Sequence, residues 1–252
     1  LIALQYHDVD FKITYRGIKD IINSSVNIEN LSENLPTVRL WANYIYLDNE
    51  ERRKFAQSSH EYLIEQVQLN EKKFTNNTTL HFNHPVKELK WVIQNDTAIQ
   101  AGEADVDATL NIKTNTNWTE NNDFLNYLSN NNLYQNIVFD NLIYDHFDKC
   151  NLILNGVERF SSQSAPYFRA LEPYNNEYMI PKLIQYSNKL IYMYSFALKP
   201  KEYQPSGTCN FSKIDSASLN FTGNLSSNHT ISVYAVNYNI LRIMSGMGGL
   251  AY

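Results

Sequence analysis

One stretch, YSFALKPKEYQPSGTCNFSKID at residues 194–215, joins an apolar strand to a second strand through a specific turn. Apolar residues alternate with others over residues 194–198, which is the period of a half-buried strand, and Pro200 is expected to end that strand because it lacks a backbone donor. Pro205 presets φ and Gly207 accepts a positive φ, so the chain is expected to reverse there. The stretch predicts strand, turn and strand, and it carries no catalytic signature.

Strand signals of this kind recur along the chain. Residues 37–47 have apolar side chains on both faces, which predicts a strand covered on both sides. Asn155 and Gly156 lie between LIL and VERF and both accept positive φ, which predicts a two-residue β-hairpin. Further strands are predicted at residues 9–15, 60–68, 88–94, 190–198, 217–222 and 230–244.

A short helix is predicted to begin after Asp48. The Asp48 carboxylate can accept from free backbone N–H groups, and Glu51 three residues later completes a capping box. Arg52, Arg53 and Lys54 are expected on the solvated face of this helix.

Several phrases of the sequence resemble, in order, motifs of one family, the major capsid proteins of nucleocytoplasmic large DNA viruses. The phrases are LWANYIYLDNEERRKFA (40–56), HEYLIEQVQ (60–68), HPVKELKWVIQ (84–94), LILNGVERF (152–160), YFRALEPY (167–174) and VYAVNYNILRIMSGMGGLAY (233–252), together with residues 194–215. They cover most of the chain after residue 37. The resemblance implies an all-β fold: an eight-stranded antiparallel jelly-roll β-sandwich with short helices in its loops, the second half of a double jelly roll.

The resemblance also implies two parts. Residues 1–36 resemble the last strand of a first jelly roll and a linker, and residues 37–252 the C-terminal jelly-roll domain. An alternative is that the strand at 9–15 is added to the one domain present. The chain begins with Leu1 rather than methionine, which favours a fragment or a processed product.

A long loop is predicted at about residues 95–148, where the strand period fades and asparagine becomes dense. Loops of this length are usually functional or carry structure of their own, and Asp123 is placed to begin one or two helical turns. In the family that the chain resembles, this loop points to the outside of the capsid.

Charge and composition limit the partners. The net charge of −5 and pI of about 5.7 give no basic field for gripping nucleic acid, so protein partners are expected. No apolar run is long enough for a membrane span, and no leader is recognisable. Two cysteines are too few for a disulfide scaffold, which favours a reducing compartment such as the cytosol. The 18 tyrosines suit wide, partly wet contact surfaces.

Neither metal nor phosphate binding is expected. His81 and His84 are three apart, so on a strand they point to opposite faces, and we expect no metal site and no cofactor. The glycine-rich residues 246–249 are not followed by a helix-forming segment, so they do not form a phosphate loop. Close backbone packing or a flexible exit from the last strand explains them better.

A thiol nucleophile is not expected either. A thiol nucleophile and its base could in principle be supplied by Cys150 or Cys209 with His146 or His229. Both cysteines, however, lie in or beside apolar strand segments, where an inert buried thiol is more common. We predict no catalytic residue and no enzymatic activity.

Glycans enter in two ways. Among the Asn-x-Ser/Thr sequences, Asn95 and Asn117 in the long loop are the candidate acceptors. The alternative function is a glycan-binding β-sandwich module, in which tryptophans stack on sugars. Trp41 and Trp91 lie in strand patterns and are expected in the core, which leaves Trp118 in the long loop.

The favoured hypothesis is a structural capsid subunit. By resemblance, two jelly rolls stand side by side, three copies form a pseudo-hexagonal capsomer, and the partners are neighbouring capsomers and minor capsid proteins. The protein is then expected in the virion shell, assembled in the host cytoplasm, with no direct contact to nucleic acid. Pro200, Pro205, Gly207, Asn155 and Gly156 are its predicted turn residues.

Overall fold

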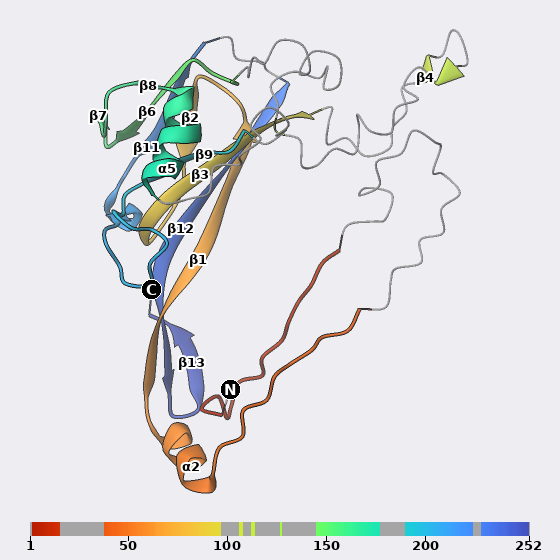
Figure 1. Ribbon diagram of the computed structural model, residues 1–252, viewed down its shortest axis with the longest axis vertical. Coiled ribbons are helices and arrows are strands. Elements are labelled where there is room, and N and C mark those ends of the chain that lie inside the picture. Colours follow the sequence, from red (N-terminus) through yellow and green to blue (C-terminus); the bar gives the residue numbers. More distant parts are fainter. Residues whose placement is uncertain are drawn as a thin grey trace.

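The computed structural model describes residues 2–15, 38–96, 106–107, 112–113, 127, 145–176, 190–223 and 228–251, and every structural statement concerns these residues. Two β-sheets face each other and form the body of the protein (Figure 1). The strands are β1 (His60–Lys73), β2 (Asn77–Leu80), β3 (Pro85–Asn95), β4 (Val106–Asp107), β5 (Ile112–Lys113), β6 (Lys149–Leu154), β7 (Val157–Glu158), β8 (Gln163–Ser164), β9 (Tyr192–Ser195), β10 (Cys209–Asn210), β11 (Ala217–Thr222), β12 (His229–Met244) and β13 (Met247–Leu250). The helices are α2 (Asn49–Gln57), a π-helical turn η2 (Tyr167–Leu171), α5 (Glu172–Asn175) and a 3-10 turn η4 (Phe211–Lys213).

The strand order is that of a jelly roll. The first sheet runs β1-β12-β3-β10, with β9 also pairing β3 and β13 pairing β12, and the second sheet runs β2-β11-β6-β7, with β8 pairing β6. Successive strands cross from one sheet to the other, from β1 to β2, β3 and β6 and later from β9 to β11 and β12. All of these pairings are antiparallel, which confirms the all-β jelly-roll fold class.

The core lies between the two sheets and is largely aromatic. Trp91 of β3 is fully buried and stacks on Tyr192 of β9, with ring centroids 6.0 Å apart. Phe168 of η2 covers the same indole at 5.3 Å, so the short helical segment seals one side of the sandwich. The second sheet contributes Leu152 and Leu219 to this cluster. Trp91 is therefore a core residue, as its strand pattern predicted.

Local signals place α2 and the β6–β7 turn. The Asp48 carboxylate accepts from the Glu51 backbone N–H at 2.8 Å, and the basic residues that follow are exposed. Asn155 and Gly156 lie at the turn between β6 and β7 with φ of 50° and 78°, the left-handed values that this two-residue connection needs.

The segment at 38–48 differs from the prediction of a covered strand. It has no regular secondary structure, and its apolar side chains are exposed, with Leu40 at 69% and Trp41 at 86%. The assignment of Trp41 to the core was wrong. The apolar pattern is that of a strand, but a strand also needs neighbouring backbone and a covering layer, and the described residues supply neither. The strand predicted at residues 9–15 is likewise not formed, since these residues have no regular secondary structure and all are exposed.

Three other details differ from the predictions. β9 ends at Ser195, five residues before Pro200, because the backbone N–H groups of Phe196 and Ala197 both turn to the Lys87 carbonyl. Residues 247–250 form the strand β13 rather than a flexible exit. The proline-punctuated stretch that begins at Ala165, interpreted from the sequence as a crossing between the sheets, contains η2 and α5.

Parts of the long loop lie outside the described residues, including Asn117, Trp118 and the predicted helix after Asp123. The described pieces include β4 and β5, which pair with each other. Within the described ranges no helix is both long and apolar enough to cross a membrane.

Candidate protein-interaction surface

An apolar strip lies on the outer face of the first sheet. It consists of Leu63, Val67 and Leu69 of β1 and Tyr234 of β12, with exposed fractions from 36% to 65%. The register pairs Leu69 with Tyr234, and Tyr234 alternates along β12 with buried core residues, so its side chain points away from the core. Most antiparallel sheets in water present polar residues on this face, and an apolar strip there indicates a surface for another protein.

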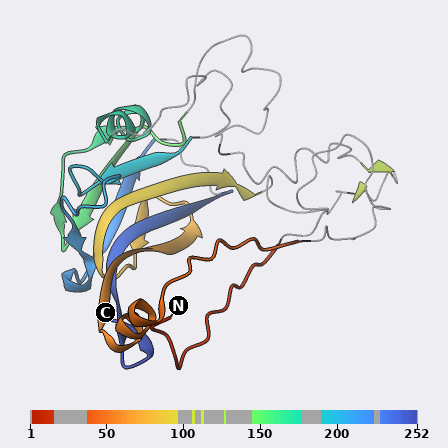
Figure 2. The same cartoon turned by 60° about the horizontal axis from the view of Figure 1, so that its bottom comes forward.

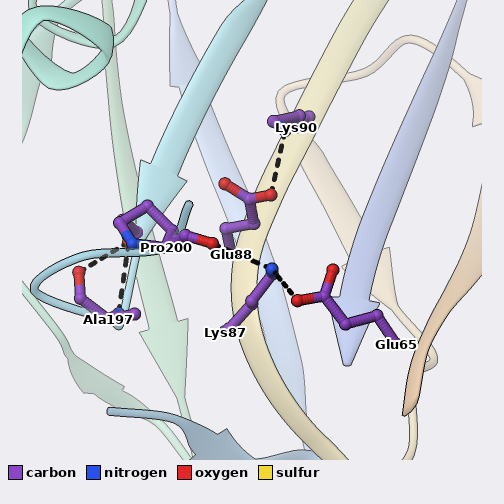
Figure 3. Close-up of polar contacts among 7 residues, drawn as sticks. Glu65, Lys87, Glu88, Lys90, Ala197 and Pro200 are labelled. Atoms are coloured by element: carbon purple, nitrogen blue, oxygen red, sulfur yellow. Dashed lines mark hydrogen bonds and ion pairs between the residues drawn. The ribbon is translucent and has the colours of Figure 1, made fainter. Parts of the chain in front are cut away.

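The charged groups on this face are already paired within the chain (Figure 3). Glu65 bonds to Lys87, and the Lys90 Nζ donates to the Glu88 carboxylate at 2.9 Å. Because these carboxylates are neutralised internally, a partner surface needs to supply apolar area rather than cations.

Lys87 is the central group of this arrangement. Its side chain is 5% exposed, and its ammonium donates to Glu65 of β1 and to the Pro200 carbonyl at 2.9 Å, while lying 5.6 Å from the Tyr238 ring centre. A β-bulge near Val236 and Asn237 in the β3–β12 pairing shifts the register at this point. Burying an ammonium is costly, and the carboxylate, carbonyl and ring together offset that cost.

Lys87 fastens the connection at residues 196–208 to the sheet. The Phe196 and Ala197 N–H groups donate to its carbonyl at 2.9 and 3.2 Å, and Ser206 Oγ accepts from the Lys199 N–H at 2.8 Å. Gly207, with φ of 148°, lies so close to the Phe196 carbonyl that a Cβ would be 2.8 Å from its oxygen.

Two large apolar side chains stand out from this fastened connection. Leu198 is 82% exposed and Tyr203 is 98% exposed. The predicted turn residues Pro200, Pro205 and Gly207 all lie on the connection, but the bends and turns occupy residues 196–204 and precede Pro205. Sequence reasoning missed Lys87, because a single lysine in a strand gives no sign that it is buried.

The cysteines and histidines considered above as a nucleophile and its base do not form a catalytic site in the described part of the chain. Burial raises the pKa of the Cys150 thiol well above its ordinary value, and burial also raises the pKa of Cys209. His146 and His229 do come together, with ring centroids 5.7 Å apart, and both are buried. The Cys150 thiol donates to the Asn151 carbonyl, 3.7 Å away.

A second buried polar cluster is structural. Arg169 donates twice to Asp145, at 2.9 and 3.1 Å, and the Tyr192 hydroxyl donates to the same carboxylate at 3.1 Å. Burial raises the pKa of Tyr192, and the negative charge of Asp145 adds to the effect, so the phenol remains a hydrogen-bond donor.

Metal-ligand geometry is absent from the described residues, where no three His, Cys, Asp or Glu side chains cluster. His81 lies in the segment between β2 and β3, and His84 precedes β3 with φ of 66°. Of the candidate glycan acceptors, Asn95 is the last residue of β3 and Asn117 lies outside the described ranges.

The fold and its surfaces define a class: an antiparallel jelly-roll protein with an exposed apolar strip on one of its sheets. The chain belongs to the family of large eukaryotic DNA virus major capsid proteins, whose model matches residues 51–249. It is 38% identical over 270 residues to the major capsid protein of Pyramimonas orientalis virus, and 33% identical over 296 residues to that of Paramecium bursaria Chlorella virus 1. Both alignments cover 100% of the chain, which spans 56% and 62% of those two proteins.

Solved structures agree. A quasi-atomic model of the PBCV-1 virus capsid matches with a TM-score of 0.56 and 33% identity, over 83% of this chain and 55% of that one. The Faustovirus major capsid protein matches with a TM-score of 0.52 and 15% identity, over 79% of this chain and 36% of that one, and this match supports the fold alone. The resemblance seen in the sequence is thus confirmed, and family membership places the chain among virion shell proteins rather than enzymes.

Proposed function

We propose that this chain is the C-terminal jelly roll, with the end of a preceding roll, of a major capsid subunit that assembles as trimeric pseudo-hexagonal capsomers. In this proposal residues 1–36 are the last strand and linker of the first roll, and residues 37–252 are the second roll. Neighbouring capsomers and minor capsid proteins are its partners, and assembly takes place in the host cytoplasm.

The observation that carries the proposal is the apolar strip formed by Leu63, Val67, Leu69 and Tyr234. An edge strand with exposed apolar side chains is an aggregation hazard for a protein that stays alone in water. The same strand is useful in a shell, where a large permanent interface covers it and where total buried areas reach thousands of Å². The paired charges beside the strip fit this use, since an interface core excludes unpaired charge.

A pair of matched valines tests the proposal. Val67 of the strip is 65% exposed and Val157 of β7 is 70% exposed, and both lie on strands. In the full subunit that contains this chain, Val67→Asp is expected to reduce the trimer fraction measured by mass photometry at least tenfold, because a carboxylate would be buried in the contact. Val157→Asp is expected to leave the trimer fraction unchanged.

Three outcomes contradict the proposal: monomers of the parent subunit, equal effects of the two substitutions, or no effect of Val67→Asp. A glycan array separates the alternative function. Strong binding of a defined sugar by a monomeric chain would favour the glycan-binding module, whereas trimers without a bound sugar favour the capsid subunit.

A further inference from the structure

The N-terminal segment packs against the far end of the roll, where β12 and β13 form a hairpin. The Tyr6 backbone N–H donates to the Gly246 carbonyl at 3.0 Å, and Ala3 is only 8% exposed. The N-terminus lies beside β13 and α2 in both views of the molecule (Figures 1 and 2). Residues 3–6 therefore have a defined position on the hairpin, although the segment at 7–15 that follows is extended and exposed.

Two glycines allow the N-terminal segment to pack this closely against the hairpin. A Cβ on Gly246 would lie 2.6 Å from Tyr6 Cδ2 and 3.2 Å from Gln5 Cβ, and one on Gly248 would lie 2.8 Å from Leu4 Cδ2. Gly249, the next residue, has nothing within 4 Å. The hairpin thus lacks side chains at the two positions where the N-terminal segment approaches its backbone.

Helix α2 forms the other wall. Ile2 and Gln5 share a recess of about 540 Å³ with α2 residues, namely Arg52, Arg53, Ala56 and Gln57. The segment thus contacts the hairpin on one side and borders this recess on the side of the helix.

We propose that Gly246 and Gly248 act as a clasp for residues 3–6 and fix the place from which the exposed segment 9–15 leaves the roll. The other extended apolar segment, residues 38–48, leaves from the same end, since Asp48 caps α2 there. Residues 9–15 have the alternation of a strand, with Val9, Phe11, Ile13 and Tyr15 as the apolar positions, and they have no backbone partner among the described residues. The binding partner that suits this segment is therefore the open edge of a β-sheet. The clasp sets the position from which residues 9–15 can pair with such a sheet edge.

A second hairpin in the chain supplies a matched control. Gly156 has φ of 78° and follows Asn155 at 50°, while Gly246 has φ of 80° and follows Ser245 at 54°. A Cβ on Gly156 would have nothing within 4 Å. Asparagine accepts left-handed φ, so Gly246→Asn and Gly156→Asn impose similar backbone cost and differ in the collision with Tyr6 and Gln5.

Hydrogen exchange of the 252-residue chain measures the clasp directly. For Gly246→Asn, exchange of the Tyr6 amide is expected to accelerate about tenfold or more, while the β12 amides keep their protection. Gly156→Asn is expected to leave the Tyr6 amide unchanged. Equal acceleration in both variants, or none in Gly246→Asn, would overturn the proposal.

A double variant guards against general loss of the hairpin. Tyr6→Ala removes the ring that the new side chain meets. Adding Gly246→Asn to Tyr6→Ala should accelerate N-terminal exchange by a smaller factor than Gly246→Asn does in the parent chain. Equal factors would show that the glycine serves the hairpin and not the clasp. Neither readout requires assembly, so the clasp and the capsid function can fail separately.

Discussion

Asn155 contributes to stability through its backbone conformation and through its side-chain hydrogen bonds, and substitutions can separate the two contributions. Its backbone is left-handed, at φ of 50°, and its side-chain Oδ1 accepts from the backbone N–H groups of Asp215 and Ser216 at 2.8 and 3.1 Å. The β6–β7 turn is thereby tied to the segment that leads into β11, so a residue predicted only as a turn former also joins distant parts of the chain.

The expected cost follows from these contacts. Both amides belong to exposed residues, so water replaces part of each lost bond, and about 0.5 kcal/mol per bond is appropriate. Asn155→Gly keeps the turn and loses both bonds, which predicts a loss of about 1 kcal/mol. Asn155→Ala adds left-handed strain of about 1 kcal/mol, for a total of about 2 kcal/mol.

Ser245→Gly provides the control. Ser245 occupies the same turn position in the β12–β13 hairpin, at φ of 54°, and its side chain forms no hydrogen bond within the described part of the chain. Ser245→Gly should change the stability by less than about 0.5 kcal/mol, because relief of strain and added unfolded-state entropy nearly cancel. The free energy of unfolding is measured by urea denaturation followed by far-UV circular dichroism. Parent-like stability of Asn155→Gly, or an equal loss in Ser245→Gly, would show that the Asn155 side-chain hydrogen bonds do not stabilise the fold.

Three further predictions concern an ion pair, a carboxylate and the two thiols. Arg169→Met should cost about 3 kcal/mol in urea unfolding, because it leaves the Asp145 carboxylate, whose side chain is only 12% exposed, without its cation. Lys199→Met, at an exposed ion pair, should cost less than about 0.5 kcal/mol, and similar losses would contradict this. Burial raises the pKa of Asp96, but hydrogen bonds from Lys73 and Thr230 outweigh this effect and hold the pKa below its ordinary 3.8. The stability that the Asp96 carboxylate contributes is therefore present above pH 3.8 and is lost as the pH falls further. Asp96→Asn should flatten the acid-unfolding profile below about pH 4, and an unchanged profile would count against this. Burial raises the pKa of both thiols, but Cys209 is partly exposed and should react with a thiol reagent in the folded chain, while Cys150 is buried and should react only on unfolding; two equally fast thiols would be inconsistent with the fold.

The sequence predicted those features that depend on neighbours along the chain. The alternation in β11 and β12, the Asp48 cap and the Asn155–Gly156 turn are all written in a few adjacent residues. The family phrases then supplied the order of strands, which no local pattern contains.

What failed depends on residues far apart. Residues 38–48 have the composition of a strand covered on both sides, and composition cannot say whether the covering partner is present. The early end of β9 results from its bonds to Lys87, which lies more than 100 residues away in the sequence. The interaction surface was missed for the same reason, since Leu63, Val67 and Leu69 become a surface only when β1 is placed beside β12. Close backbone packing was one of two alternatives for residues 246–249, and Gly246 and Gly248 show it, but no sequence signal pointed to the segment that packs on them.

Cryo-electron microscopy of the virus particle that carries this chain would show whether it forms a jelly roll of the capsid shell. We expect trimeric capsomers in which each subunit contains a roll with the strand order β1-β12-β3-β10 facing β2-β11-β6-β7, and with Leu63, Val67 and Leu69 covered by protein. Capsomers without this roll, or a roll whose apolar strip faces solvent in the assembled shell, would contradict this expectation.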